Sequence, residues 1–277
     1  MIAAFIVIGM LAAVVFARAA RADETADNLA AANAAYARHD YIAALTLLRP
    51  LAIAGNATAQ NDLGVMYANA LGVTRDYAEA LRWYRKAAAQ GNVDAENNLG
   101  FMYAKAQGVP RDEAEAVRWY RKAAEQGDAR AENNLGIKYE TGAGVRKNAA
   151  EAVRWYRKAA EQGYAAAQSN LGSMYADGDG VLRNDAEALS WYRKAAEQGN
   201  ADAQANLGAM YLDGQGMPED DVEAYMWLSL AAAGGSDSAA KNRDDLEPSL
   251  TAKQLAEARQ RAAAWQPAGA AATKRAP

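Results

Sequence analysis

The residue types that most often carry catalysis or metal binding are sparse in this chain. The sequence has no cysteine, which excludes disulfides, thiolate metal sites and cysteine nucleophiles. His39 is the only histidine, so a zinc site there would need carboxylates as its other ligands. Ser238 and Lys241 have the Ser-x-x-Lys spacing of some acyl-transfer enzymes, but the partner motifs Ser-Asp-Asn and Lys-Thr-Gly are missing. We therefore expect no catalytic, metal or cofactor site, and predict that the protein is not an enzyme.

Aromatic and basic residues recur together in a string that could bind a polymer. Trp-Tyr-Arg-Lys begins at Trp83, Trp119, Trp155 and Trp191, and Trp227 keeps the same step. The aromatic pairs could stack on sugar rings, but their place beside the buried stripe of a helix is more typical of a core. The basic row that contains Arg118 and Arg154 could bind an acidic polysaccharide. Helical spacing instead favours local ion pairs, at Glu79–Arg82, Arg121–Glu125, Arg157–Glu161 and Arg193–Glu197.

A fixed step of 36 residues positions these side chains. Leu-Gly recurs at Leu63-Gly64, Leu99-Gly100, Leu135-Gly136, Leu171-Gly172 and Leu207-Gly208. A period of this length is typical of stacked-repeat proteins, in which each unit is one supersecondary element. The composition is alanine-rich and poor in strand-forming residues after residue 20, so the units are predicted to be helical.

Residues 92–127 illustrate one unit. Asn92 is predicted to cap the first helix, whose apolar face includes Leu99, and Gly100 would let another helix approach closely. Asp112 is predicted to cap the second helix and to form a capping box with Glu115, three residues on. The same pair returns at Asp76/Glu79, Asn148/Glu151, Asn184/Glu187 and Asp220/Glu223. Each unit is therefore predicted to be an antiparallel helix pair that must stack on its neighbours to bury both apolar faces.

Five such units are predicted over residues 56–235, flanked by atypical ends. Residues 27–55 are interpreted as a degenerate N-terminal capping helix pair, with Leu47 and Leu48 in place of Trp-Tyr. Residues 236–265 are interpreted as C-terminal capping helices, the last of them opened by Thr251 and Gln254. Residues 266–277 are predicted to be a disordered tail.

The first 22 residues indicate where the protein is located, and its net charge limits the partners it can bind. Residues 2–17 are an apolar run shorter than a typical membrane span, and small residues at spacing typical of signal-peptidase sites follow. We predict a signal peptide over residues 1–22, with an N-terminal membrane anchor as the alternative. Either segment would place the chain in the periplasm or outside the cell, or on the inner membrane. The net charge of −4 argues against nucleic acid as a partner.

Each unit has three parts: Ala-x-x-Asn-Leu-Gly-x-Met-Tyr, a Gly-x-Gly-Val loop, and Glu-Ala-x-x-Trp-Tyr-Arg-Lys-Ala-Ala-x-Gln-Gly. This pattern resembles the Sel-one-like repeat (SLR), a relative of the tetratricopeptide repeat (TPR). The resemblance implies an all-α fold: a right-handed α/α solenoid, a TPR-like superhelix, of 36-residue helix-turn-helix repeats. It also implies that the protein is a scaffold in protein complexes with functions in the bacterial envelope, and exopolysaccharide assembly is one such function. One branch of the family is cysteine-rich and linked to penicillin-type compounds, and this cysteine-free chain departs from it.

In such folds the first helices line the concave face, so their outward positions are candidates for partner contact. If Leu99 points inward, positions 94, 97, 101, 104 and 105 lie on the opposite side at about 100° per residue. Position 101 and its equivalents are Val65, Phe101, Ile137, Ser173 and Ala209. The predicted partner-binding residues are Val65, Asp94, Asn97, Phe101, Arg130, Asn133 and Ile137. Packing against the adjacent unit is an equally open interpretation of these positions.

The leading hypothesis is a non-enzymatic, exported scaffold that binds a protein or peptide in this groove, because an apolar strip with a polar rim is typical of partner sites. A scaffold that binds an acidic polysaccharide is the first alternative. A hydrolase acting on β-lactam or peptidoglycan-type substrates is the second. Neither nucleic acid nor a cofactor is expected, and membrane contact is expected only if residues 1–22 are retained.

Overall fold

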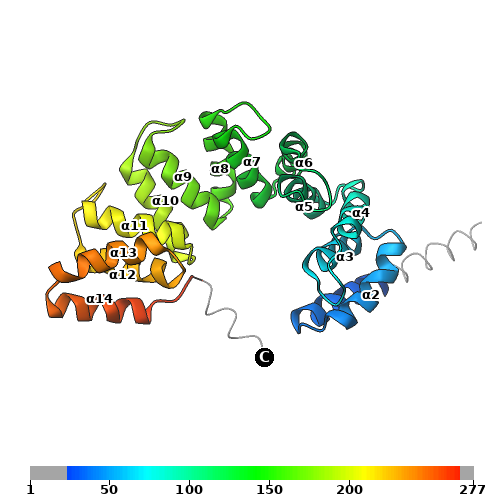
Figure 1. The fold of residues 1–277 in the computed structure, drawn as a ribbon, viewed down its shortest axis with the longest axis horizontal. Helices are drawn as coiled ribbons and strands as arrows, with labels where there is room; N and C mark the ends of the chain where they lie inside the picture. The colour runs from blue at the N-terminus through cyan, green and yellow to red at the C-terminus, as the bar shows by residue number, and fades with distance from the viewer. Residues whose placement is uncertain (1–23, 269–277) are drawn as a thin grey trace, which may run out of the picture. The chain divides into compact units, whose positions relative to one another are not determined.

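The computed structural model describes residues 24–268. The predicted signal peptide and the greater part of the predicted tail, residues 269–277, lie outside them. The chain divides into two compact units, residues 1–123 and 124–277, which we call unit 1 and unit 2. The described parts of both are helical, which confirms the all-α fold class with paired helices (Figure 1). Between residues 24 and 268, no helix is long and apolar enough to cross a membrane.

Unit 1 holds the N-terminal helix pair and the first two repeats. Its elements are a helix over residues 24–37, α2 (Tyr41–Ile53), α3 (Ala57–Asn69), α4 (Tyr77–Ala88), α5 (Val93–Ala104) and most of α6 (Glu113–Glu125). Helix 24–37 is already helical at the first described residue, earlier than position 27, where the predicted N-terminal helix pair begins. The helix–turn–helix pairs otherwise match the predicted phase.

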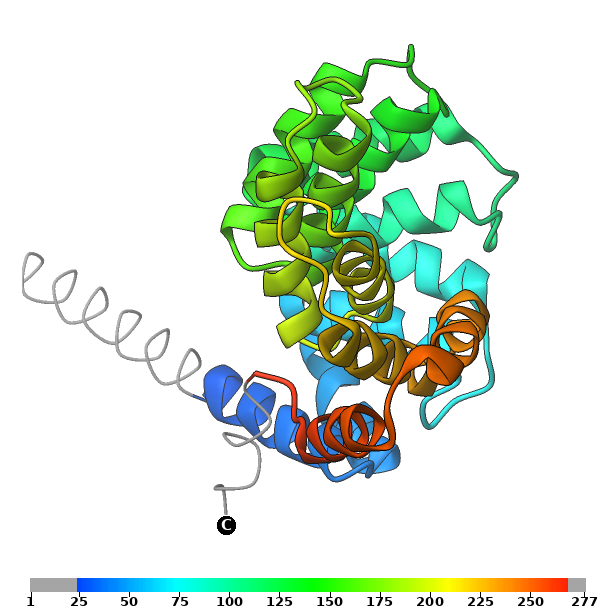
Figure 2. The same cartoon turned by 90° about the vertical axis from the view of Figure 1, so that its left-hand side faces the viewer.

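Unit 2 holds the other three repeats and the C-terminal helices. Its elements are α7 (Ala129–Thr141), α8 (Ala149–Glu161), α9 (Ala165–Asp177), α10 (Asp185–Glu197), α11 (Ala201–Asp213), α12 (Asp221–Ala233), α13 (Asp237–Leu246), the 3-10 turn η1 (Glu247–Ser249) and α14 (Ala252–Ala264). The last helix, red in Figure 2, packs against α12.

Side-chain caps start the helices as predicted, but most of the expected capping boxes are only half formed. Asn92 Oδ1 accepts the Ala95 N–H at 2.9 Å, and Asp76 Oδ1 accepts the Glu79 N–H at 2.9 Å. The returning bond from the glutamate is absent there, because the Asp76 N–H already donates to the Tyr67 carbonyl at 3.0 Å. Thr251 and Gln254 form a complete box.

Three of the glutamates that were expected in capping boxes pair with the arginine three residues on instead. Arg82 Nη1 donates to Glu79 Oε1 at 2.8 Å, and the same contact joins Arg118 to Glu115 at 2.7 Å and Arg154 to Glu151 at 2.6 Å. These pairs lie on exposed helix surfaces, so each contributes little to stability. Their effect is to neutralise the basic row.

The repeated glycine of the first helix marks the closest approach between the two helices of a repeat. A Cβ built on Gly100 would lie 2.6 Å from Cδ1 of Tyr120, which is 3% exposed. A side chain at this position would therefore displace a buried ring. The same contact joins Gly64 to Tyr84, Gly136 to Tyr156 and Gly172 to Tyr192, whereas Gly208 faces Leu228. This is the packing reason for the in-phase glycines.

The loop glycine explains how one repeat meets the preceding one. Gly108 has φ of 71°, and a Cβ there would lie 2.8 Å from the Tyr77 carbonyl oxygen. Only glycine combines this left-handed conformation with so close a backbone approach. The loop after α5 therefore lies against the first residue of α4.

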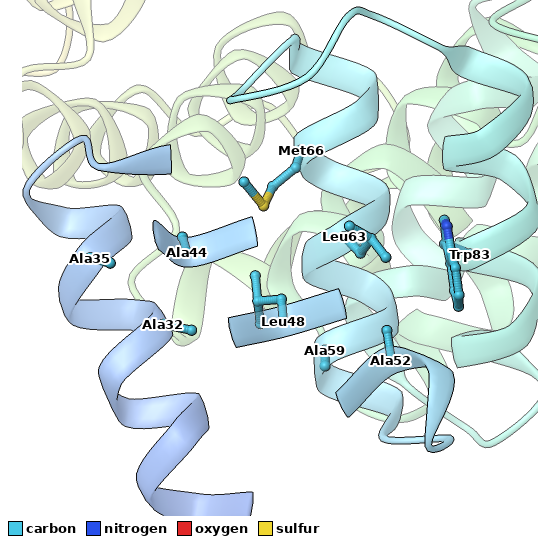
Figure 3. Close-up of a cluster of buried hydrophobic side chains, with 9 residues drawn as sticks. All are labelled: Ala32, Ala35, Ala44, Leu48, Ala52, Ala59, Leu63, Met66 and Trp83. Carbon is cyan, nitrogen blue, oxygen red and sulfur yellow. The ribbon is translucent and has the colours of Figure 1, made fainter. Parts of the chain in front are cut away.

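A buried cluster shows how the N-terminal pair is joined to the first repeat. In Figure 3, α2 lies between helix 24–37 and α3, and Leu48 points into the space between them. Leu48 is 2% exposed and Leu63 of α3 is 1% exposed. Trp83 of α4 belongs to the same cluster. The degenerate pair therefore buries the open side of the first repeat, as a capping unit must.

The C-terminal end of the described chain is more ordered than the sequence suggested. Trp265 meets Trp227 edge to face, with ring centroids 6.3 Å apart. The N–H of Ala268 donates to the Glu197 carbonyl at 2.7 Å, and Pro267 lies next to Gly199. Residues 266–268, the first part of the predicted tail, therefore lie against the end of α10.

Candidate functional site

Two exposed aromatic rings distinguish the first-helix face of unit 1. Phe101 of α5 is 44% exposed and Tyr36 of helix 24–37 is 39% exposed, values unusual for such large side chains in a packed domain. Val65 of α3 is half-buried and packs against the cluster of buried residues that contains Leu99 of α5. We call the area formed by Tyr36, Asp62, Val65, Asn98 and Phe101 the Tyr36–Phe101 surface.

This surface contains two pockets that share Val65. The smaller, of about 190 Å³, is lined by Ala32, Asn33, Tyr36, Leu48, Asp62 and Val65. The larger, of about 420 Å³, is lined by Val65, Ala68, Asn69, Arg75, Tyr77, Tyr84, Asn98, Phe101, Met102 and Gln107. Arg75 lies at the larger pocket, where its guanidinium is 5.9 Å from the centre of the Tyr77 ring. Hollows with apolar walls and a few polar groups are the usual form of a recognition site.

The predicted contact residues are distributed over both units. Val65 and Phe101 line the larger pocket together, and Asp94 is exposed on α5. Ile137 and Arg130 belong to α7 in unit 2. Ile137 is half-buried against the core of that unit, and Arg130 is exposed, with its guanidinium 2.7 Å from Asp128 Oδ2.

Asn97 and Asn133 were expected to face outward, and this expectation is wrong. Asn97 is 7% exposed and Asn133 is 5% exposed. Asn133 Oδ1 accepts from Nδ2 of Asn170 in the next first helix at 2.9 Å, and Asn61 accepts in the same way from Asn98 at 3.0 Å. Helical spacing counts only the geometry of one helix, whereas the neighbouring repeat covers this side. Ala104, 9% exposed, is buried against the core as well.

Asp62 is the titratable group at the smaller pocket. Its Oδ1 accepts from Asn61 Nδ2 at 3.2 Å. Burial raises the pKa of the Asp62 carboxyl, the Asn61 hydrogen bond lowers it, and the negative charge of Asp94 raises it further. Among the residues that the structure describes, no lysine or arginine pairs with this carboxylate. A partly desolvated acid without a counter-ion is costly, and such groups gather at functional sites.

Two buried tyrosines of the second helices, Tyr84 at the larger pocket of unit 1 and Tyr156 in unit 2, have raised pKa values without being reactive groups. Burial raises the pKa of Tyr84, and the charge of Asp62 raises it further. Burial is also the main cause of the raised pKa of Tyr156, whose hydroxyl donates to Glu140. A phenol with a raised pKa stays protonated at neutral pH, so these rings serve as hydrogen-bond donors and core.

The Trp-Tyr-Arg-Lys string is part of the scaffold. Tyr84, Tyr120, Tyr156 and Tyr192 are buried, and the tryptophans pack against the preceding repeat where the described clusters contain them. The lysine three residues on lies over each ring, 4.0 Å from the centre of Trp83 and 4.3 Å from that of Trp155. The faces that sugar rings would need are therefore covered.

The predicted ion pairs on the second helices form only in part. The Glu79–Arg82 pair is confirmed. Arg157 and Arg193 do not pair with Glu161 and Glu197, because their guanidinium groups donate to Tyr175 and Tyr211 in the following first helix, at 2.6 and 2.8 Å. These arginines therefore link successive repeats.

The other candidate chemistries find no assembled site in the described part of the chain. Over residues 24–268, no group of three or more histidines, cysteines and carboxylates is placed to hold a metal ion. His39 lies in an exposed turn, where its Nδ1 is 2.8 Å from the Tyr41 hydroxyl. Ser238 is exposed, and its Oγ is 3.2 Å from Oγ of Ser236.

Sequence reasoning missed Tyr36 and Asp62. Tyr36 lies in the degenerate helix pair, where the 36-residue phase is lost, so no repeat position identified it. Asp62 did carry a signal, because the residue before Leu-Gly is asparagine in the other four repeats: Asn98, Asn134, Asn170 and Asn206. The change from an amide to a carboxylate at one position of a regular array identifies a place where the repeat has been altered.

The comparisons with known proteins identify the repeat. The sequence profile of the Sel1 repeat matches residues 57–92, 93–128, 129–164, 165–200 and 201–236. A solved Sel1 repeat protein from Oxalobacter formigenes is 38% identical, with a TM-score of 0.73, over 78% of this chain and 86% of that one. The immunity protein PA5088 from Pseudomonas aeruginosa is 22% identical, with a TM-score of 0.53, over 75% of this chain and 82% of that one, a likeness of fold alone. None of the curated proteins matches the chain.

Proposed function

Because the chain belongs to the Sel1 repeat family, we propose that it is a non-enzymatic scaffold that binds a protein or peptide on the Tyr36–Phe101 surface. The observation that carries this proposal is the pair of exposed aromatic rings, Phe101 and Tyr36, beside two pockets that adjoin at Val65. Exposed aromatic side chains next to apolar pockets are the usual anchors of protein interfaces. Polar groups such as Asn33, Asn98 and Asp62 supply the rim.

The repeated Trp-Tyr-Arg-Lys string on the second helices does not suit a polysaccharide. A sugar polymer would need free aromatic faces or unpaired basic groups, and the second helices offer neither at the repeated string. The lysines cover the tryptophans, and Arg82, Arg118 and Arg154 pair with glutamates. The larger pocket combines apolar contact at Val65 and Phe101 with polar groups such as Asn98, Gln107 and Arg75, which suits an apolar side chain together with the polar backbone of a bound peptide.

The test is selection of displayed peptides on the immobilised protein, followed by measurement of Kd for the best peptide. Phe101→Ala is expected to weaken binding at least tenfold, which is about 1.4 kcal/mol, because it removes an aromatic anchor. Leu182→Ala is the matched control, since Leu182 is 90% exposed on a loop of unit 2. Equal binding by both variants would refute the site, and failure to select any peptide would refute the function.

We also propose that the chain works outside the cytoplasm. This proposal is supported only by the sequence of residues 2–22, whose apolar run and small residues are typical of a signal segment. Fractionation of cells that express the chain with and without residues 2–22 tests it. Export that does not depend on those residues would contradict the proposal.

A further inference from the structure

Asp62 interrupts a ladder of asparagines on the first helices. Asn98 donates its Nδ2 to Asn61 at 3.0 Å, and Asn170 donates in the same way to Asn133 at 2.9 Å. A carboxylate has no proton to donate, so Asp62 cannot extend this pattern toward helix 24–37. It accepts from Asn61 instead and borders the smaller pocket. The substitution thus gives up a donor and places a negative charge at a hollow.

Three of the helices around the pocket carry acids and no base, and the base of the fourth, Arg49 of α2, donates to the Tyr67 hydroxyl at 3.3 Å. Helix 24–37, α3 and α5 contain no lysine or arginine within their bounds. Their ionisable acids are Glu24, Asp27, Asp62, Asp94 and Glu96. Asp94 acts on Asp62 as a like charge. A hollow with low-dielectric walls and charges of one sign attracts a ligand of the opposite sign.

The walls of the pocket fit the stem of a long basic side chain. Leu48 and Val65 are apolar, and the Tyr36 ring stands exposed at its edge. Lysine and arginine pack their methylene groups against such surfaces while the charged head finds a carboxylate. An aromatic ring nearby adds a cation–π contact. The size of the pocket, about 190 Å³, is suited to one side chain rather than to a larger ligand.

We propose that the Asp62 pocket binds a lysine or arginine side chain of the peptide partner, with the Asp62 carboxylate as its counter-ion. This proposal rests on the proposed function, because it assigns one subsite of the Tyr36–Phe101 surface. The apolar side chain of the same peptide occupies the neighbouring pocket at Phe101, and Val65 separates the two. The partner is therefore a basic and apolar segment.

A purely structural role for Asp62 makes a different prediction. If the carboxylate served only to end the asparagine ladder, its replacement would leave the selectivity for peptides unchanged. The array itself supplies the variant, because asparagine occupies the equivalent position in the other four repeats. Asp62→Asn therefore removes the charge with a residue that this fold accepts. Asp202→Asn is the matched control, an exposed aspartate of α11 in unit 2.

The experiment uses two pairs of blocked heptapeptide pools with random flanking residues. One pair has arginine or its neutral isostere citrulline at the centre, and the other has lysine or acetyl-lysine. Pools are incubated with the immobilised full chain, and the retained fraction is measured by mass spectrometry. We expect the native protein to retain at least one cationic pool about fivefold better than its neutral counterpart. Asp62→Asn should bring that ratio to about one, and Asp202→Asn should leave it unchanged.

The possible results distinguish failure of the Asp62 subsite from failure of the proposed function. If native protein retains cationic and neutral pools equally, or if Asp62→Asn keeps the preference, the Asp62 subsite is wrong. The proposed function survives that result if Phe101→Ala still lowers retention of every pool. If no pool is retained above a blank surface, both proposals fail. Non-specific electrostatic attraction would also refute the subsite. In that case, retention would disappear in high salt for both the native protein and Asp202→Asn, and it would not depend on Phe101.

Discussion

The first-helix surfaces of unit 1 and unit 2 share one scaffold and differ in what they expose. Both repeats of unit 1 have a bulky apolar residue at position 101 or its equivalent, Phe101 and Val65, whereas unit 2 has Ile137 in its first repeat and the smaller Ser173 and Ala209 in the other two. Of the large apolar side chains described as exposed, Tyr36, Ile42, Ile53 and Phe101 belong to unit 1 and Leu182 to unit 2. The repeats therefore keep the same residues at their core positions and differ at their surface positions. The positions at which the repeats differ are the ones where a function is expected.

The first helices of the two units also differ in charge. The first helices α3 and α5 of unit 1 carry acids and no base. In unit 2, α7 carries Arg130 and Lys138 among its acids. A partner drawn to the negative and apolar surface of unit 1 would therefore find no equivalent site on α7. Two units built from one repeat can thus have separate surface chemistry without any change of core.

The largest predicted effect tests whether the scaffolds are equivalent. Leu99 in unit 1 and Leu171 in unit 2 are both 0% exposed. Leu99→Ala and Leu171→Ala are each expected to lower the free energy of unfolding by about 2–5 kcal/mol, through lost burial and a cavity. Urea denaturation followed by circular dichroism measures both. Costs that differ by more than about 2 kcal/mol would show that one unit is packed less well than the other.

The next effect concerns the glycine contact, which differs between the first and last repeats. A Cβ at Gly64 would lie 2.6 Å from the Tyr84 ring, whereas at Gly208 it would lie 2.8 Å from Leu228 Cγ. Gly64→Ala is expected to cost about 1–3 kcal/mol, because a rigid ring must move. Gly208→Ala should cost less, because leucine can change rotamer. The same denaturation measurement checks this order.

A double variant controls the interpretation of the glycine contact. Adding Tyr84→Leu to Gly64→Ala replaces the ring that the new methyl group meets with leucine, the residue that faces Gly208 in the last repeat. The second substitution should then cost less in the Gly64→Ala background than in the native protein. Additive costs would mean that the ring is not what the new methyl group displaces.

A smaller effect is expected from Phe101→Ser, which places the unit 2 residue of Ser173 in unit 1. Because Phe101 is 44% exposed, its removal should lower the free energy of unfolding by only about 1 kcal/mol. In a chain of this size that shifts the thermal midpoint by about 2–4 °C. Differential scanning calorimetry provides the measurement. A loss as large as that of Leu99→Ala would place Phe101 in the core instead of on a binding surface.

Most of the scaffold could be predicted from the sequence, because the repeat makes its rules local. Caps such as Asn92, the helix pairs and the packing role of Gly100 depend on residues a few positions apart or one repeat away. The array repeats each signal, which guards against a chance match. The family and the five repeats followed from the same periodicity.

The candidate site was harder to predict, because it depends on contacts that break the period. Asn97 and Asn133 looked outward on one helix and are buried by the neighbouring repeat. Tyr36 comes from a helix outside the repeat phase, and Asp62 had to be noticed as an exception to asparagine. The docking of Ala268 on Glu197 likewise joins segments that no repeat relates.

The smallest predicted effect is the contribution of Asp62 to the dependence of stability on pH. Burial raises the pKa of this carboxyl above its ordinary value of 3.8, so the folded state holds the proton more tightly than the unfolded state. Stability is therefore lost as pH rises through the interval from 3.8 to the raised pKa of the folded state. Asp62→Asn has no such proton. Its thermal midpoint should match that of the native protein at low pH and exceed it slightly at neutral pH, whereas Asp202→Asn should track the native protein throughout. A residue that lowers stability at neutral pH, in a repeat whose other copies avoid it, is retained for something other than folding. A midpoint for Asp62→Asn below that of the native protein at neutral pH would instead make the carboxylate a structural group, and would remove this distinction between the two surfaces.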